Sequence, residues 1–186
     1  MNFKQYQKET IRTFAFRQTS LTTTMTDMLH CAIGIATEVG ELIEAFSKDN
    51  QDEVNIGEEI ADQMWYISNL SNFIKFDLET ECCLRNTICY KDTNRYLDEQ
   101  VILSGELLDI FKKTIYYNKE LNLIDIKVIL IRMTNNLNEL SKYKGMNIYD
   151  LLDKNISKLK IRFPEKFTEE LSQNRDLKSE RKALED

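Results

Sequence analysis

The sequence is short of the residues that interrupt helices. It contains five glycines and one proline among 186 residues, whereas these two types make up about 12% of an average protein. This scarcity argues against a β-sandwich or barrel with many turns, and against a glycine-rich loop that cradles phosphates. Long helices need few such residues, so the composition favours an all-α fold.

A positive net charge and long apolar runs are also missing. Lys and Arg number 25 against 31 Asp and Glu, which gives a net charge of −6 and no sign of the basic surface of a DNA- or RNA-binding protein. No stretch reaches about 18 uncharged apolar residues, and the first residues lack the apolar core of a secretory signal. We therefore expect a cytoplasmic protein that binds neither nucleic acid nor a membrane.

The cysteines do not form a recognised metal motif. No two of them stand in a C-x-x-C spacing, so free thiols are favoured over a zinc site built from His30, Cys31, Cys82 and Cys83. Cys89 completes the set of four cysteines.

Apolar side chains recur at helical spacing along most of the chain. Thr26 and Asp27 are residue types that cap helix N-termini, and Pro164 is expected to end the last predicted helix. From residue 169 onward the chain is charged and nearly free of large apolar side chains, which predicts a solvated helix or a frayed end. The predicted helices span residues 3–17, 28–47, 56–76, 78–90, 97–118, 124–143 and 148–162.

Two stretches of the chain resemble each other. Residues 40–46 (GELIEAF) align with residues 105–111 (GELLDIF), and the Asn-Leu pair at 69–70 aligns with the pair at 136–137. Two tandem helical hairpins, packed about a pseudo-twofold axis, would form one four-helix-bundle core. The alternative is a chance alignment of amphipathic helices. The predicted layout is a single domain over 1–168, with hairpin repeats at about 28–76 and 97–143, and a charged tail at 169–186.

Four acidic residues stand at matched positions on two neighbouring predicted helices. Glu38 and Glu41 are three residues apart, and Glu59 and Asp62 repeat that spacing on the next helix, so each pair shares one helix surface. At about 100° per residue, both pairs flank their apolar stripes on the same side. If the helices pack antiparallel through these stripes, the four carboxylates converge at the edge of the core.

Four converging carboxylates repel one another unless cations lie between them. Oxygen ligands in this number suit Mg²⁺ or Mn²⁺, so the pattern predicts a divalent metal site. A di-iron bundle would need Glu-x-x-His motifs on two helices, and the single histidine, His30, nearly excludes it. The alternative is that the acids are solvated helix faces of a non-enzymatic adaptor or regulatory module.

The residues around these acids resemble a known family. Residues 38–41 (EVGE) and 59–62 (EIAD) resemble the E-x-x-E…E-x-x-D motif of the all-α NTP pyrophosphohydrolases, the MazG-like superfamily that includes the dimeric dUTPases and the dCTP pyrophosphatases. Residues 58–67 are similar to the family's E-E-L-G-D-x-x-W-Y-L segment. Residues 155–164 are similar to its N-x-x-K-L-x-x-R-Y-P ending, and Tyr6-Gln7 resembles the Y-Q that opens its first helix.

The chain departs from the family's pattern in two ways. Ala61 replaces the usual glycine and Gln63 stands where an apolar residue is common, but neither change removes a charge that the chemistry needs. In the second repeat only Glu106 keeps its acid, which implies one active half and one half that serves as a packing partner. The positions aligned there with Glu38, Glu59 and Asp62 are Leu103, Ile126 and Ile129.

The resemblance implies a nucleotide pyrophosphohydrolase that converts a nucleoside triphosphate, with dUTP and dCTP among the candidates, to the monophosphate and pyrophosphate. Glu38, Glu41, Glu59 and Asp62 would hold two or more Mg²⁺ ions, or Mn²⁺, which neutralise the triphosphate and lower the pKa of the attacking water. Glu38 or Glu41 would accept the proton of that water. A modified nucleotide or a nucleotide-sugar-like pyrophosphate is the alternative substrate, and a homodimer is expected.

The resemblance also suggests residues that bind the substrate. Two cations four residues apart on one helix could clamp phosphate oxygens, an asparagine could bond to sugar or phosphate, and two aromatic side chains could stack on a base. The alternatives are solvated helix charges and ordinary core aromatics. The candidates are Lys48, Trp65, Tyr66, Asn155, Lys158 and Arg162.

Overall fold

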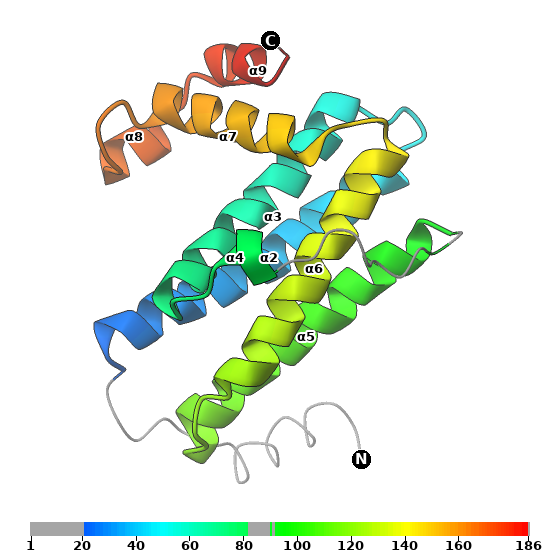
Figure 1. Ribbon diagram of the computed structural model, residues 1–186. Coiled ribbons are helices and arrows are strands. Elements are labelled where there is room, and N and C mark those ends of the chain that lie inside the picture. The colour runs from blue at the N-terminus through cyan, green and yellow to red at the C-terminus, as the bar shows by residue number, and fades with distance from the viewer. Residues whose placement is uncertain (1–20, 82–89, 91, 186) are drawn as a thin grey trace, which may run out of the picture.

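A computed structural model describes residues 21–81, 90 and 92–185 of the chain, and every regular element in these ranges is an α-helix (Figure 1). The predicted all-α class is therefore confirmed. The predicted helix at 3–17, with its Tyr6-Gln7 pair, lies outside the described residues, as do Cys82, Cys83 and Cys89. Cys31 is buried and is a free thiol.

Four long helices form the core of the molecule (Figure 1). Helices α2 (Thr23–Ser47) and α3 (Glu53–Phe73) make one hairpin, and α5 (Asn94–Tyr117) and α6 (Leu123–Tyr143) make another. α2 packs against both α3 and α5, while α6 packs against both α5 and α3. One continuous cluster of buried apolar side chains fills the space between the four helices.

In the second hairpin, the positions aligned with three of the acids belong to this core. Leu103 and Ile126 are completely buried, and Ile129 is nearly so. Burying such a side chain contributes roughly 1.5–3 kcal/mol, so these positions supply packing where the first hairpin carries charge. Glu106, the one acid kept in the second repeat, is exposed. The duplication itself and the domain boundaries stay predictions.

Capping side chains set the helix starts and move two predicted boundaries. α2 begins before the predicted residue 28, because the Thr22 side chain accepts a hydrogen bond of 3.2 Å from the backbone N–H of Met25. The expected caps, Thr26 and Asp27, therefore lie inside the helix. α3 also begins early, because the Asp52 carboxylate accepts hydrogen bonds of 3.0 and 3.3 Å from two backbone N–H groups of the first turn.

Two further helices complete the described part before the C-terminal segment. α4 (Leu78–Glu81) covers the start of the helix predicted at 78–90, and the residues that follow it, up to 89, lie outside the described ranges. α7 (Ile148–Arg162) has the predicted bounds and packs across α3 (Figure 1). α7 thereby brings its side chains to the α2–α3 hairpin.

The charged C-terminal segment forms α8 (Glu169–Gln173) and α9 (Leu177–Glu185). α8 has no buried residue, as expected of a solvated helix, but α9 packs along α7, contrary to the expectation. Glu180 of α9 is 2% exposed and accepts hydrogen bonds from Arg162 Nε at 3.1 Å and Arg175 Nη2 at 2.7 Å. The prediction was wrong for α9 because Glu180 and its two arginine partners do not lie on one helix. Helical spacing in the sequence therefore does not indicate their contacts.

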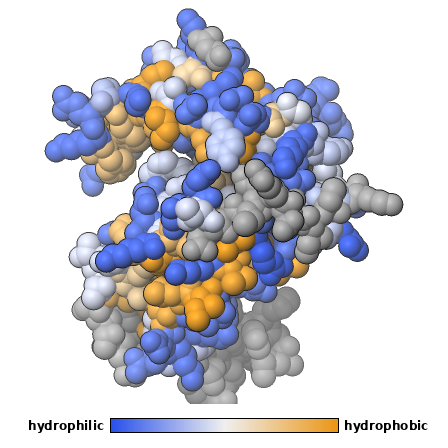
Figure 2. All heavy atoms as spheres, in the orientation of Figure 1, coloured by the Kyte–Doolittle hydropathy of each residue, from blue (hydrophilic) through white to orange (hydrophobic). Residues whose placement is uncertain are grey.

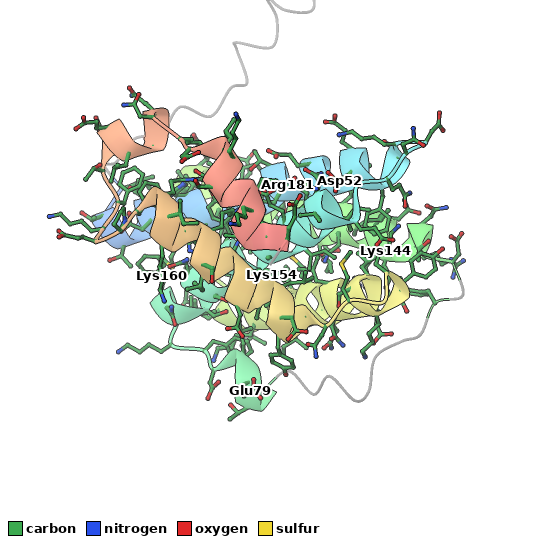
Figure 3. All side chains as sticks on the ribbon, turned by 90° about the horizontal axis from the view of Figure 1, so that it is seen from above. Asp52, Glu79, Lys144, Lys154, Lys160 and Arg181 are labelled. Carbon is green, nitrogen blue, oxygen red and sulfur yellow. The ribbon has the colours of Figure 1, made fainter. Side chains whose placement is uncertain are left out.

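Two more contacts hold α9 in place, one to the start of α3 and one to α7. The Arg181 guanidinium lies 2.7 Å from the carboxylate of Asp52 at the start of α3, and Figure 3 shows the two side chains close together. The Lys154 ammonium on α7 donates to the backbone carbonyl of Leu184 at 2.9 Å. α9 thus joins α7 to the beginning of α3.

The face in Figure 2 is mostly hydrophilic, and apolar side chains show in its upper part, where α7 lies in Figure 1, and in its lower half, where the lower ends of α3 and α6 lie. Among the described residues, none of the helices combines the length and the apolarity that a membrane-spanning segment needs. The homodimer stays a prediction.

Removing the Glu180 carboxylate should destabilise the protein, because Arg162 and Arg175 would lose their shared partner. Burial raises the pKa of Glu180, but the hydrogen bonds from both arginines outweigh burial and hold it at about 2. We expect Glu180→Ala to lower the free energy of unfolding by about 2–4 kcal/mol at neutral pH, measured by urea denaturation. Because the native pKa is below its ordinary value, this difference should shrink as the pH falls from about 4.5 towards 2.

The matched control is Glu185→Ala, which removes an exposed partner of Arg181 on the same helix. An exposed ion pair is worth about 1 kcal/mol or less, so the control should lose little stability. Equal losses in the two variants would contradict the role of Glu180.

Candidate active site

α2 and α3 bring three of the four predicted acids together. Glu38, Glu41 and Glu59 each present a carboxylate oxygen within 4.8 Å of the other two. Glu38 is half-buried, Glu41 is exposed, and Glu59 is 8% exposed. The site therefore opens to solvent on the side of Glu41 and is closed by the core on the side of Glu59.

The three carboxylates have no ion pair with a basic side chain in the part of the chain that the structure describes. Burial, with the charges of Asp62 and Glu41, raises the pKa of Glu38 to about 7. Burial, with the charges of Glu41 and Asp62, raises the pKa of Glu59 to about 8. A divalent cation would relieve this repulsion, and an all-oxygen donor set of this kind fits Mg²⁺ or Mn²⁺.

Asp62, the fourth predicted acid, is held by side chains of α7. The Lys158 ammonium lies 2.7 and 2.6 Å from its two carboxylate oxygens, and 3.1 Å from an oxygen of Glu58. The Asn155 amide also donates to Asp62 Oδ1. Since Lys158 is 1% exposed and Asn155 2% exposed, the alternative of a solvated helix charge is wrong for Lys158.

The other two predicted phosphate-binding cations have partners elsewhere. Arg162 is bound by Glu180 of α9. Lys48 follows the last residue of α2, where its ammonium lies 3.6 Å from Glu44, and both side chains are exposed. Among the described residues, neither cation forms an ion pair with the four predicted acids.

Tyr66 packs against α2 beside the acids. A Cβ atom at Gly34 would lie 2.3 Å from a ring carbon of Tyr66, so the close approach of the ring to α2 requires glycine there. The ring meets those of His30 and Trp65 edge-on, with centroids 5.8 and 4.9 Å away. Burial, with the charge of Glu38, raises the pKa of Tyr66. Trp65 is 38% exposed, and stacking of either ring on a base stays a prediction.

The geometry adds three residues that the sequence reasoning did not single out as site residues: Glu58, Arg175 and Glu180. Glu58 precedes Glu59 in the E-E pair of the motif, so its sequence position was an available signal. Arg175 and Glu180 give no such signal, because they lie on either side of the start of α9 and meet Arg162 across the fold.

Residues 27–96 match the family model of the MazG nucleotide pyrophosphohydrolase domain. The match covers 70 of the 186 residues, so this part of the chain is similar to that domain. It begins in the second turn of α2, includes α3 and α4 and ends in the first turn of α5, so it contains the four acids but not α7. No curated protein and no solved structure matches the chain significantly.

The MazG-type domain confirms the predicted enzyme class, a hydrolase that acts on nucleotide anhydrides. It favours the enzymatic interpretation over the non-enzymatic adaptor. Asn155, Lys158 and Arg162 lie beyond the matched segment. For Asn155 and Lys158, the link to the site therefore rests on their contacts with Asp62.

The metal-free protein should lose stability as the pH rises from about 4.5 to about 8, because native Glu38 and Glu59 hold protons more tightly than the unfolded chain does. Glu59→Gln removes one of the repelling charges. We expect it to raise the free energy of unfolding by about 1–3 kcal/mol near pH 8 and to change it little near pH 4.5. Urea denaturation in the presence of EDTA measures both values.

Glu106→Gln serves as the control, since it removes an exposed carboxylate from the second hairpin. It should change the stability by no more than about 0.5 kcal/mol at either pH. If Glu59→Gln destabilised the metal-free protein equally at both pH values, the repulsion inferred for this site would be wrong.

Proposed function

We propose that the chain is a Mg²⁺-dependent nucleoside triphosphate pyrophosphohydrolase that forms a nucleoside monophosphate and pyrophosphate. The observation that carries this proposal is the convergence of Glu38, Glu41 and Glu59 inside the segment that matches the MazG-type domain. dUTP and dCTP are the first substrates to test, and Mn²⁺ is the alternative cation.

The residues that would hold the divalent cations are Glu38, Glu41, Glu59 and Asp62, which together would serve two or more ions. When bound, a divalent cation neutralises the triphosphate and lowers the pKa of an attacking water. The opening at Glu41 supports entry of the nucleotide from solvent, because this is the exposed member of the cluster. Either Glu38 or Glu41 accepts the proton of the water as it attacks phosphorus.

Side chains of α7 would bind the phosphates of the substrate. Lys158 now contacts Asp62, and Arg162 contacts Glu180. Each would exchange a carboxylate partner for a phosphate oxygen, which accepts the same charge-assisted hydrogen bonds. Asn155 would bond to the sugar or a phosphate, and Trp65 and Tyr66 would contact the base.

The proposal also covers the binding partner, the cellular location and the oligomeric state. A nucleotide rather than a nucleic acid is the proposed partner, because the net charge of −6 offers no basic surface for a polyanion. We also propose a cytoplasmic homodimer, which light scattering of the purified protein would test. A modified nucleotide is the substrate to examine next if the common nucleotides fail.

Hydrolysis should depend on the acidic cluster and on Mg²⁺. With purified protein and a panel of common ribo- and deoxyribonucleotides plus dUTP, we expect the monophosphate and pyrophosphate as products, resolved by anion-exchange chromatography. Glu38→Gln and Asp62→Asn should lower kcat/KM by about 10²–10⁴-fold, because each removes a carboxylate of the site.

Glu106→Gln, at the aligned position of the second hairpin, should retain wild-type activity. Release of the diphosphate with inorganic phosphate would contradict the proposed reaction. So would a wild-type protein that leaves the whole panel unchanged with either Mg²⁺ or Mn²⁺.

A further inference from the structure

The carboxylates at the junction of α2, α3 and α7 fall into two groups. Glu58 and Asp62 contact the ammonium of Lys158. Glu38, Glu41 and Glu59 lie within 4.8 Å of one another and form no ion pair in the described part of the chain. One group thus has a cation supplied by the protein, and the other has none.

Lys158 places a positive charge against both carboxylate oxygens of Asp62. Its ammonium lies 2.6 and 2.7 Å from the two oxygens of Asp62 and 3.1 Å from Glu58, and the side chain is 1% exposed. Asn155, one helical turn earlier on α7, donates a further hydrogen bond to Asp62. Both carboxylate oxygens of Asp62 therefore contact side chains of α7 in this structure.

Glu59 makes the second group a site rather than a chance gathering of acids. It is 8% exposed, it has no hydrogen-bond partner among the described residues, and its carboxylate belongs to the cluster with Glu38 and Glu41. A buried carboxylate without a partner keeps its proton, and it gives the proton up when a cation binds beside it. We therefore take the carboxylate of Glu59 as one side of a cation-binding site.

We propose that Lys158 is a built-in counter-ion that takes the place of a second metal ion at Asp62 until a nucleotide binds. The free protein then binds one divalent cation per chain, at Glu38, Glu41 and Glu59. An ammonium and a divalent cation that share one carboxylate repel each other, so they compete for Asp62. This inference rests on the proposed function, because it requires the metal site.

On this proposal, Lys158 leaves Asp62 when a nucleotide binds, which makes the second metal position available. If Lys158 left Asp62 without a new partner, a buried ammonium and two carboxylates would remain unpaired, which is unfavourable. The oxygens of a triphosphate offer that partner, since phosphate accepts the same charge-assisted hydrogen bonds as a carboxylate. Lys158 would then bind the substrate, and Asp62 would become available as a metal ligand.

The test counts Mn²⁺ ions bound per chain without nucleotide, by electron paramagnetic resonance of free Mn²⁺ and by calorimetry. We expect one ion for the wild type and two for Lys158→Met, because the variant frees Asp62. Lys160→Met is the matched control: this lysine is exposed on the same helix and is labelled in Figure 3. The control should bind one ion, with the wild-type Kd.

Asp62→Asn gives an independent measurement if Lys158→Met does not fold, as judged by circular dichroism. Asp62 is not a ligand of the first ion, so this variant should still bind one Mn²⁺, with a Kd weakened by about 10–100-fold or less because a neighbouring negative charge is lost. A folded Asp62→Asn variant that binds no Mn²⁺ would overturn the inference.

Two further results would contradict the proposal. Two Mn²⁺ ions on the nucleotide-free wild type, or a folded Lys158→Met variant with one ion and an unchanged Kd, would overturn the inference and leave the proposed function standing. No Mn²⁺ on the wild type would overturn both, because the metal site itself would be absent.

Discussion

Repulsion among carboxylates at the α2–α3 interface is the constraint on which the rest of the site depends. Glu38, Glu41 and Glu59 are held within 4.8 Å of one another by two helices whose apolar faces fix their spacing. Such an arrangement reduces the stability of a metal-free protein. Lys158 offsets part of the negative charge, and among the described residues no basic side chain forms an ion pair with the three glutamates.

Helices α7 and α9, outside the α2–α3 hairpin, position the ammonium of Lys158. α7 crosses α3 so that Asn155 and Lys158 reach Asp62. α9 in turn holds α7 through Glu180, which binds Arg162 and Arg175. The C-terminal segment is therefore connected to the acidic site through α7, which carries both Lys158 and Arg162. The second hairpin contributes apolar side chains to the core, since the positions aligned with Glu38, Glu59 and Asp62 are apolar and buried there.

The sequence predicted the helices and the site acids because both follow from local periodicity. Helical spacing located the buried faces, and the same angular arithmetic put Glu38, Glu41 and Glu59 on facing sides of one hairpin. The contacts of Lys158 and Glu180 could not be predicted in this way. They join residues on different helices, and their existence depends on how α7 crosses α3 and how α9 lies on α7. The starts of α2 and α3 lie earlier in the chain than predicted, because Thr22 and Asp52 cap an earlier turn of these helices.

The most direct test of the acidic site is the position of Mn²⁺ in crystals of the protein, located by anomalous scattering. An ion bound by carboxylate oxygens of Glu38, Glu41 and Glu59 at about 2.2 Å is the expected result. An ion bound only at other residues, or three side chains that diverge with basic groups between them, would contradict it.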